Sequence, residues 1–240
     1  MVTRATGTIL EVDGVSKRFG GMVALKGTTL SVREGSITGL IGPNGSGKST
    51  LFDIMTGYLR PDEGRVRFRG KVVSNVPPHE VSRRGLIRTF QLTRIFPSLT
   101  VRENLLVCST DSGAQGVADR SNELLDFVRL SHLADQEAAA LSYGQQKLLE
   151  IAQVLMLEPT MLLLDEPMAG INPGLANEIA NHLHALQAAG KTLLLVEHNL
   201  PMVTSLCSEV IVLNAGQVIA HGPPAEVVAD PDVKEAFLGS

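Results

Sequence analysis

The chain has 240 residues, 44% of them hydrophobic and 19% charged, and a formal net charge of −4 at pH 7. This length can bury a full hydrophobic core, as one large domain or as a domain with a subdomain. The composition is ordinary for a soluble globular protein and excludes the strongly basic balance of a dedicated nucleic-acid binder.

The ends and the cysteines favour a cytoplasmic protein. Residues 1–7 lack the apolar core of a secretory signal, and no apolar run approaches the ~20 residues that span a bilayer. Any membrane association is therefore expected to come through a partner. Cys108 and Cys207 lie in different hydrophobic segments without metal-ligand spacing, and we expect both to be buried, reduced thiols.

The first part of the chain predicts strands and short helices. Strands are expected at 10–13, 24–32 and 37–41, with Gly20 and Gly21 as the turn between the first two. A helix follows to about Thr56. Residues 65–69 alternate and predict an edge-type antiparallel strand, and a short helix is expected to start at 77–78 and to end at Gly85.

The stretch between the third strand and the first helix is a phosphate-binding loop. Residues 42–50, the phosphate loop, match the pattern G-x-x-x-x-G-K-[ST]. Its members are Gly42, Pro43, Asn44, Gly45, Ser46, Gly47, Lys48, Ser49 and Thr50. The glycines let successive N–H groups turn toward an anion, Lys48 reaches the β- and γ-phosphates, and the Ser49 hydroxyl can ligate Mg²⁺. The sequence therefore predicts a nucleoside triphosphate site.

The middle and the end of the chain predict an inserted helical segment and a second half of the sheet. Between about residues 92 and 157 helical signals dominate, at 101–108, 123–130 and 145–157, with 111–116 as a flexible connector. Apolar runs at 161–164 and 193–196 flank a helix from Pro173 that ends before Gly190, which indicates a parallel βαβ unit. A hairpin at 210–213 and 217–220 and a helical tail complete the chain.

Two carboxylates follow the strand at 161–164. Asp165 and Glu166 would lie at the carboxyl edge of a parallel sheet, where nucleotides bind in such folds. In a phosphate-loop NTPase, Asp165 would hold Mg²⁺ and Glu166 would accept a proton from an attacking water. An acidic turn at the surface is the alternative interpretation of the pair by itself.

A third stretch connects these motifs to a family. Residues 141–146, Leu-Ser-Tyr-Gly-Gln-Gln, precede a helix, so Ser142 and Gly144 first predict an N-cap and a flexible entry. Together with the phosphate loop and Asp165–Glu166, this serine–glycine loop resembles the ATP-binding subunits of ABC transporters, over essentially all 240 residues. The resemblance implies an α/β fold: one ATP-binding domain with a RecA-like P-loop NTPase core (about 1–91 and 158–240), an antiparallel β subdomain and the helical subdomain (about 92–157).

The resemblance also implies an ATPase that uses ATP and Mg²⁺, with further site residues. Gln91 matches the glutamine that contacts Mg²⁺ and the attacking water, and His198 matches the histidine that bonds the γ-phosphate. Phe19 aligns with the aromatic residue that stacks on adenine, although a core phenylalanine is the competing interpretation. The family works as a head-to-tail pair, in which Ser142, Gly144 and Gln145 of one subunit would contact the ATP of the other.

Several stretches resemble importers of branched-chain amino acids and related amides, namely 87–91, 96–105, 141–146, 166–173 and 231–239. Asn172, where the wider family usually has aspartate, and a short region between 106 and 121 depart from the pattern. Partners implied are transmembrane permease subunits, a second ATP-binding subunit (identical or different) and, indirectly, a periplasmic or extracellular solute-binding protein, with no nucleic acid. The chain would then be peripheral on the inner face of the cell membrane.

Three other functions compete with an importer ATPase. An exporter ATPase of the lipopolysaccharide type and a soluble ABC-type ATPase of translation, DNA repair or cluster assembly would carry the same motifs. Repair types have long coiled-coil insertions and translation types duplicate the cassette, and this chain shows neither. A phosphate-loop kinase would leave residues 142–145 unexplained.

Overall fold

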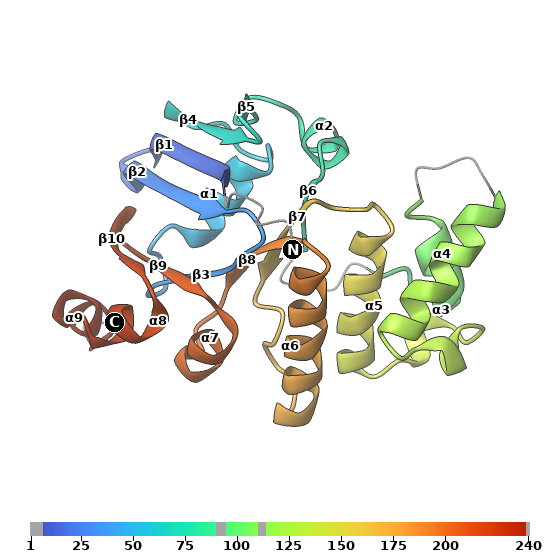
Figure 1. Ribbon diagram of the computed structural model, residues 1–240. Helices are drawn as coiled ribbons and strands as arrows, with labels where there is room; N and C mark the ends of the chain where they lie inside the picture. The colour runs from blue at the N-terminus through green and yellow to red at the C-terminus, as the bar shows by residue number, and fades with distance from the viewer. Residues whose placement is uncertain (1–6, 90–94, 110–113, 239–240) are drawn as a thin grey trace.

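The structure, a computed structural model, describes residues 7–89, 95–109 and 114–238, and its strands form two sheets (Figure 1). The smaller sheet has the order β2-β1-β4-β5 and is antiparallel, and the larger has the order β10-β9-β3-β8-β7-β6. The strands are β1 (Thr8–Phe19), β2 (Met22–Arg33), β3 (Ile37–Ile41), β4 (Glu63–Phe68), β5 (Lys71–Val72), β6 (Leu86–Arg88), β7 (Met161–Asp165), β8 (Thr192–Val196), β9 (Glu209–Asn214) and β10 (Gln217–Gly222).

The helices lie on both sides of the larger sheet. Figure 1 shows α1 and the smaller sheet on one side and α6 and α7 on the other, with α5, α4 and α3 following outward from α6. The helices are α1 (Lys48–Met55), α2 (Pro78–Arg83), α3 (Val101–Leu106), α4 (Ala114–Phe127), α5 (Tyr143–Leu155), α6 (Pro173–Ala188), α7 (Leu200–Leu206), α8 (Pro224–Ala229) and α9 (Pro231–Leu238), and single 3₁₀ turns occur at Ser131–Leu133 and Ala138–Ala140. Among the described residues, no helix is long and apolar enough to cross a bilayer.

The central strands are buried on both faces because each face has its own apolar core. In β7, Met161 and Leu163 pack with α1 and the smaller sheet, whereas Leu162 and Leu164 pack with the helices of the opposite side. Alternate side chains of a strand point to opposite faces, so a continuous run of leucines serves both cores. The apolar runs in the sequence are therefore explained by a sheet covered on two sides.

Several expectations are confirmed at the level of single elements. The strand at 37–41 leads into the phosphate loop, and β7, α6 and β8 form a parallel βαβ unit. The final hairpin pairs β9 with β10. The composite α/β architecture, with antiparallel strands beside a mainly parallel sheet and an inserted helical segment, is the one that the family resemblance implied.

One expectation about the strands is wrong, and one strand was not expected. The strand predicted as an edge, β4, lies between β1 and β5, because the chain turns back after Phe68 and adds a two-residue strand. The strand β6 was not expected at all. It has only three residues, too few for a recognisable period, and it is defined by parallel pairing of Arg88 with Leu163 on β7.

The helical segment also differs in detail from the sequence prediction. The expected connector 111–116 overlaps α4, which already begins at Ala114, and the helix predicted to reach Leu130 ends at Phe127. Helix α7 was not predicted. Both cysteines are free thiols, but Cys108 is only partly buried, since it lies just beyond the end of α3, whereas Cys207 is buried.

A buried asparagine fixes the start of the helical segment. Asn104 is fully buried, its Oδ1 accepts hydrogen bonds from the Phe96 N–H at 2.8 Å and from Gln153 Nε2 at 3.2 Å, and its Nδ2 donates to the Thr100 carbonyl at 2.9 Å. One amide thus satisfies the backbone before α3 and a side chain of α5. Buried polar groups without such partners are costly.

Asn104→Ala is expected to lower the free energy of unfolding by about 2–4 kcal/mol, because it orphans several buried polar groups at once. Denaturant-induced unfolding followed by circular dichroism measures the change. Asn122→Ala, at an exposed position on α4, is the control and should change the free energy by no more than about 0.5 kcal/mol. Equal destabilisation by the two variants would contradict the role given to Asn104.

Candidate functional site

One cleft lies where the parallel strands end. Strands β3 and β7 both pair with β8, and Leu40 and Asp165 are each in register with Val196. The segments that follow these residues therefore meet at one edge of the sheet. The cleft has a volume of about 380 Å³ and is lined by Phe19, Met22, Val23, Ala24, Asn44, Gly45, Ser46, Gly47, Lys48, Ser49, Thr50, Glu166 and Val196.

At two positions the backbone of the phosphate loop leaves no room for a side chain, so only glycine fits there. A Cβ on Gly42 would lie 2.0 Å from the carbonyl oxygen of Leu213, and one on Gly47, at φ +106°, would lie 2.6 Å from that of Ala24. Gly47 also caps α1, whose first residues are Lys48 and Ser49. The loop therefore presents the N-terminal end of a helix to the cleft, which favours an anion. Gly42 and Pro43 support the loop without lining the cleft.

Lys48 is held inside the loop. Its Nζ donates to the carbonyl oxygens of Gly42 at 2.8 Å and Pro43 at 2.9 Å, so the ammonium already sits where phosphate oxygens would compete for it. Burial lowers the pKa of Lys48, whereas the negative charges of Glu166 and Asp165 raise it. The cation of the site thus lies close to two carboxylates.

Glu166 and His198 face each other at the end of the sheet. His198 Nε2 lies 3.2 Å from Glu166 Oε2, and the Glu166 N–H donates to the Val196 carbonyl at 3.0 Å. Glu166 has a φ of +49°, a conformation that non-glycine residues rarely adopt. This backbone, together with the bond to Val196, places the carboxylate at the cleft rather than continuing the strand.

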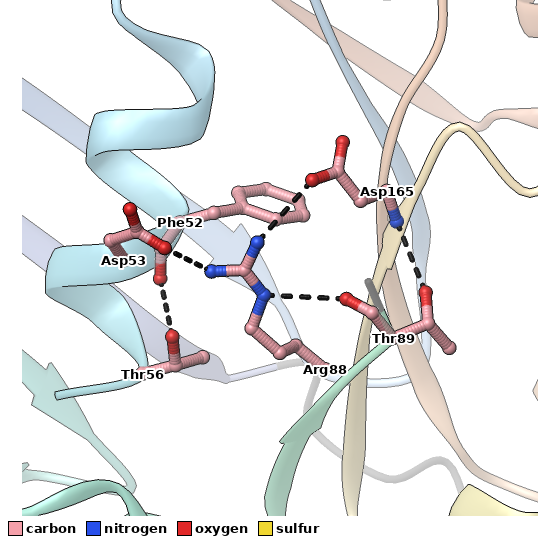
Figure 2. Close-up of polar contacts among 6 residues, drawn as sticks. All are labelled: Phe52, Asp53, Thr56, Arg88, Thr89 and Asp165. Atoms are coloured by element: carbon pink, nitrogen blue, oxygen red, sulfur yellow. Dashed lines mark hydrogen bonds and ion pairs between the residues drawn. The ribbon is translucent and has the colours of Figure 1, made fainter. Parts of the chain in front are cut away.

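Asp165 is bonded to an arginine that sequence analysis did not single out. Arg88 Nη2 lies 3.3 Å from Asp165 Oδ2, and Arg88 Nη1 forms a second ion pair with Asp53 of α1 (Figure 2). Burial raises the pKa of Asp165; the Arg88 charge opposes this shift, and Glu166 and Asp53 add to it. The Asp165 side chain is only 9% exposed, so its orientation depends on these contacts.

Phe19, the last residue of β1, lines the cleft. The residue is 46% exposed, which a core phenylalanine would not be, and the Lys17 ammonium lies 5.8 Å from the ring centroid. Met22 and Val23 at the start of β2 are exposed beside it in the same cleft. The wall therefore offers an accessible aromatic and aliphatic surface.

The serine–glycine loop lines a different cleft. Ser142 and Gln145 form a capping box at the start of α5 and share a cleft of about 350 Å³ with Asn172 and Glu178. Gly144 is buried, and a Cβ there would lie 2.0 Å from Leu175 Cδ2, so this glycine lets α5 pack against α6. Asn172 is the N-cap of α6 and accepts from the Leu175 N–H at 3.0 Å. Within one chain, this loop and the phosphate loop do not share a cleft.

Three further residues belong to the candidate site. Gln91, expected from the sequence, lies outside the described residues. Arg88 and Glu197 were not predicted, and a lone arginine in a strand carries no sequence pattern that would indicate a role. Glu197 is buried, its Oε1 accepts from the Met168 N–H at 3.1 Å, and it supports the turn after Glu166. Burial raises the pKa of Glu197.

The donor set fits a nucleotide with a magnesium ion. The phosphate loop offers N–H groups and the Lys48 ammonium, and the Ser49 hydroxyl lies in the cleft while Asp165 adjoins it. Within the described ranges, no group of three or more His, Cys, Asp or Glu residues is arranged around a metal position. Mg²⁺ in nucleotide sites is typically held by one or two protein ligands and the phosphates themselves. Ser49 and Asp165 would be those ligands.

Comparisons with known proteins point to one family. A family model described as "ABC transporter" matches residues 25–169, and one described as "Branched-chain amino acid ATP-binding cassette transporter" matches residues 217–240. The chain is 41% identical to a probable branched-chain amino acid transport ATP-binding protein LivG of Methanocaldococcus jannaschii, with 98% of this chain and 99% of that protein covered. It is 36% identical to the high-affinity branched-chain amino acid transport ATP-binding protein BraF of Pseudomonas aeruginosa, with 96% and 98% covered.

Solved structures give the same picture. The ADP conformation of an ATP-binding cassette of an ABC transporter superposes with a TM-score of 0.89 at 40% identity, over 98% of this chain and all of that one. A dimeric, post-hydrolysis cassette bound to ADP and Pi superposes with a TM-score of 0.79 at 28% identity, over 90% of this chain and 99% of that one.

Lys48→Ala is expected to weaken ATP binding about 10- to 100-fold, because the phosphates lose a charge-assisted hydrogen bond of about 1.5–3 kcal/mol. Titration calorimetry with ATP measures the change. The exposed Lys71 of β5 lies outside the cleft, so Lys71→Ala should bind ATP like the unmodified protein. Unaltered affinity in Lys48→Ala would remove this lysine from the site.

Proposed function

This chain belongs to the ABC transporter family, and we propose that it is the ATP-hydrolysing subunit that energises a membrane importer for branched-chain amino acids or related amides. The observation that carries the proposal is the cleft in which the phosphate loop, with Lys48, faces Glu166. The import branch is supported by the relatives' names and by the family match at residues 217–240, the end of the chain. That match favours import over the lipopolysaccharide exporter type.

The reaction that these residues would carry is the attack of water on the γ-phosphorus of ATP. The bond from this phosphorus to the bridging oxygen breaks, ADP keeps the electron pair, and Glu166 takes a proton from the water. The Lys48 ammonium and the N–H groups of the phosphate loop stabilise the phosphate charge. Ser49 and Asp165 would hold Mg²⁺, which would supply further neutralisation of the phosphate charge.

Histidine and glutamine complete the proposed machinery. His198, on the segment after β8, has its Nε2 3.2 Å from Oε2 of Glu166, which lines the cleft, so it is assigned a contact with the γ-phosphate. Gln91 is assigned a contact with Mg²⁺ and the attacking water through its match to the family pattern. Phe19 is assigned the adenine, since an exposed ring at the wall of a nucleotide cleft offers a stacking surface.

The unit proposed to be active is a head-to-tail pair of ATP-binding subunits. The serine–glycine loop lines a cleft of its own, with Ser142 at the start of α5, and can therefore present a second helix N-terminus to a nucleotide held by another chain. Ser142, Gly144 and Gln145 would act in this way. Closure of two chains on ATP would then drive the motion of the membrane partner.

The partners follow from this role. Transmembrane permease subunits would hold the pair at the inner face of the cell membrane, and a periplasmic or extracellular solute-binding protein would deliver the solute to them. The second ATP-binding subunit is either a copy of this chain or a related one. Purification from membranes with the permease subunits attached, followed by ATP-dependent uptake of leucine into reconstituted vesicles, tests the assignment. Uptake that does not depend on this chain would refute it.

His198→Ala is expected to leave the dissociation constant for ATP unchanged. It should reduce turnover by at least ~10²-fold, the effect of losing one transition-state contact. Phosphate release under saturating MgATP gives the rate, and a parallel binding titration separates it from affinity. His184→Ala, on α6 and outside the cleft, serves as the control. An unchanged turnover number in His198→Ala would show that the histidine has only a structural role.

Glu166→Gln is expected to bind ATP but not to hydrolyse it, because the amide keeps the shape of the side chain and cannot take the proton. Unhydrolysed ATP should then accumulate as a bridge between two chains, and light scattering should detect an ATP-dependent dimer. Adding Ser142→Arg should dissolve this dimer by placing a bulky side chain in the opposing site. Hydrolysis at the original rate, measured with the membrane partners present, would show that Glu166 is not the base.

A further inference from the structure

An ion-pair bridge connects three elements beneath the nucleotide cleft. Arg88, the last residue of β6, donates from Nη2 to Asp165 Oδ2 at 3.3 Å and pairs through Nη1 with Asp53 (Figure 2). Asp165 ends β7, and Asp53 belongs to α1. One guanidinium therefore ties the strand that ends in the proposed metal ligand to the helix that begins with Lys48 and Ser49.

The arginine is fixed within this bridge. Its side chain is 7% exposed, and its guanidinium carbon lies 5.8 Å from the centroid of Phe52 and 5.9 Å from that of Tyr58. Its Nε donates to the Thr89 carbonyl at 3.3 Å. Cation–π contacts and hydrogen bonds in several directions leave such a group little freedom.

The carboxylate of Asp165 is oriented by the same contacts. Its backbone N–H donates to Thr89 Oγ1 at 3.2 Å, and Arg88 holds only one of its oxygens (Figure 2). Within the ranges that the structure describes, Oδ1 has no hydrogen-bond partner. The bridge thus fixes the rotation of the carboxylate and leaves one oxygen for another ligand.

We propose that Arg88 is a positioning residue for Mg²⁺, which sets Asp165 at a fixed place relative to the Ser49 end of α1. The proposal rests on the function proposed above, in which these two residues hold the ion. Arg88 does not line the nucleotide cleft, so it acts on the ion through Asp165 and not by contact with ATP. Groups that orient metal ligands typically contribute 10- to 100-fold to metal affinity.

The bridge needs the shape of arginine as well as its charge. A planar guanidinium offers separate N–H groups to two carboxylates, whereas a lysine ammonium is a point charge on a flexible stem. Arg88 also lies between the carboxylates of Asp53 and Asp165, with Glu166 next in the chain. Without its charge these carboxylates would repel each other. Loss of Arg88 therefore removes both the orientation of Asp165 and the compensation of its charge.

The test measures how much Mg²⁺ strengthens nucleotide binding. Calorimetric titration of the whole chain with the nonhydrolysable analogue AMP-PNP, in EDTA and in excess MgCl₂, gives two dissociation constants and their ratio. Arg88→Met should leave the constant in EDTA little changed and reduce the strengthening by Mg²⁺ about 10-fold or more. Arg88→Lys, which keeps the charge, and Asp53→Asn, which removes only the α1 anchor, should reduce it less.

A matched control separates this effect from general stability. Arg33 pairs with Glu209 at the opposite end of the sheet, so Arg33→Met removes an arginine–carboxylate pair far from the cleft and should not change the ratio. A normal ratio in folded Arg88→Met, whatever its melting temperature, would overturn the proposal. If that variant does not fold, normal ratios in both Arg88→Lys and Asp53→Asn would overturn it. Absence of Mg²⁺-strengthened binding in the unmodified protein would instead refute the proposed function.

Discussion

The parallel pairing of β3, β7 and β8 is the constraint on which the rest of the site depends. Because Leu40, Val196 and Asp165 are in register across three neighbouring strands, the chain leaves the sheet three times at the same edge. One exit makes the phosphate loop, one makes the Asp165–Glu166 turn, and one carries His198. A slip of one residue in either pairing would turn every side chain of the slipped strand to the opposite core and separate these groups.

Charge compensation is the second organising feature, and it follows from this convergence. Asp165, Glu166 and Glu197 come together at the edge of the sheet where the triphosphate is proposed to bind. Lys48 and Arg88 lie among them, one inside the phosphate loop and the other beneath it. Two cations therefore favour a polyanion at this edge. Lys48 is bonded to backbone carbonyls, and Arg88 is paired with two carboxylates. A nucleotide bound as proposed would compete with the carbonyls for Lys48 and would leave the ion pairs of Arg88 in place.

The two halves of the proposed ATP site differ in what holds them. The phosphate loop is fixed by glycines that approach backbone carbonyls of Ala24 and Leu213, so its shape is set by the core of the chain. The serine–glycine loop is fixed by its own capping box and by Leu175, on the helical side of the molecule. A motion of the helical side relative to the core would change the distance between the half-sites of neighbouring chains without deforming either loop. This is what the proposed closure of two chains on ATP requires.

The phosphate loop, the Asp165–Glu166 turn, the βαβ unit and the α/β class could be predicted from the sequence, because each depends on residues that are neighbours in the chain. Glycine spacing, strand-length leucine runs and a proline at a helix start act locally. Three features could be recognised only in the folded chain: the strand β6, the interior position of β4 and the bridge from Arg88 to Asp165 and Asp53. A three-residue strand and a lone arginine carry no period or motif, and their partners lie 35 and 77 residues away in the chain. Such contacts are formed by the packing of whole elements, which no local pattern contains.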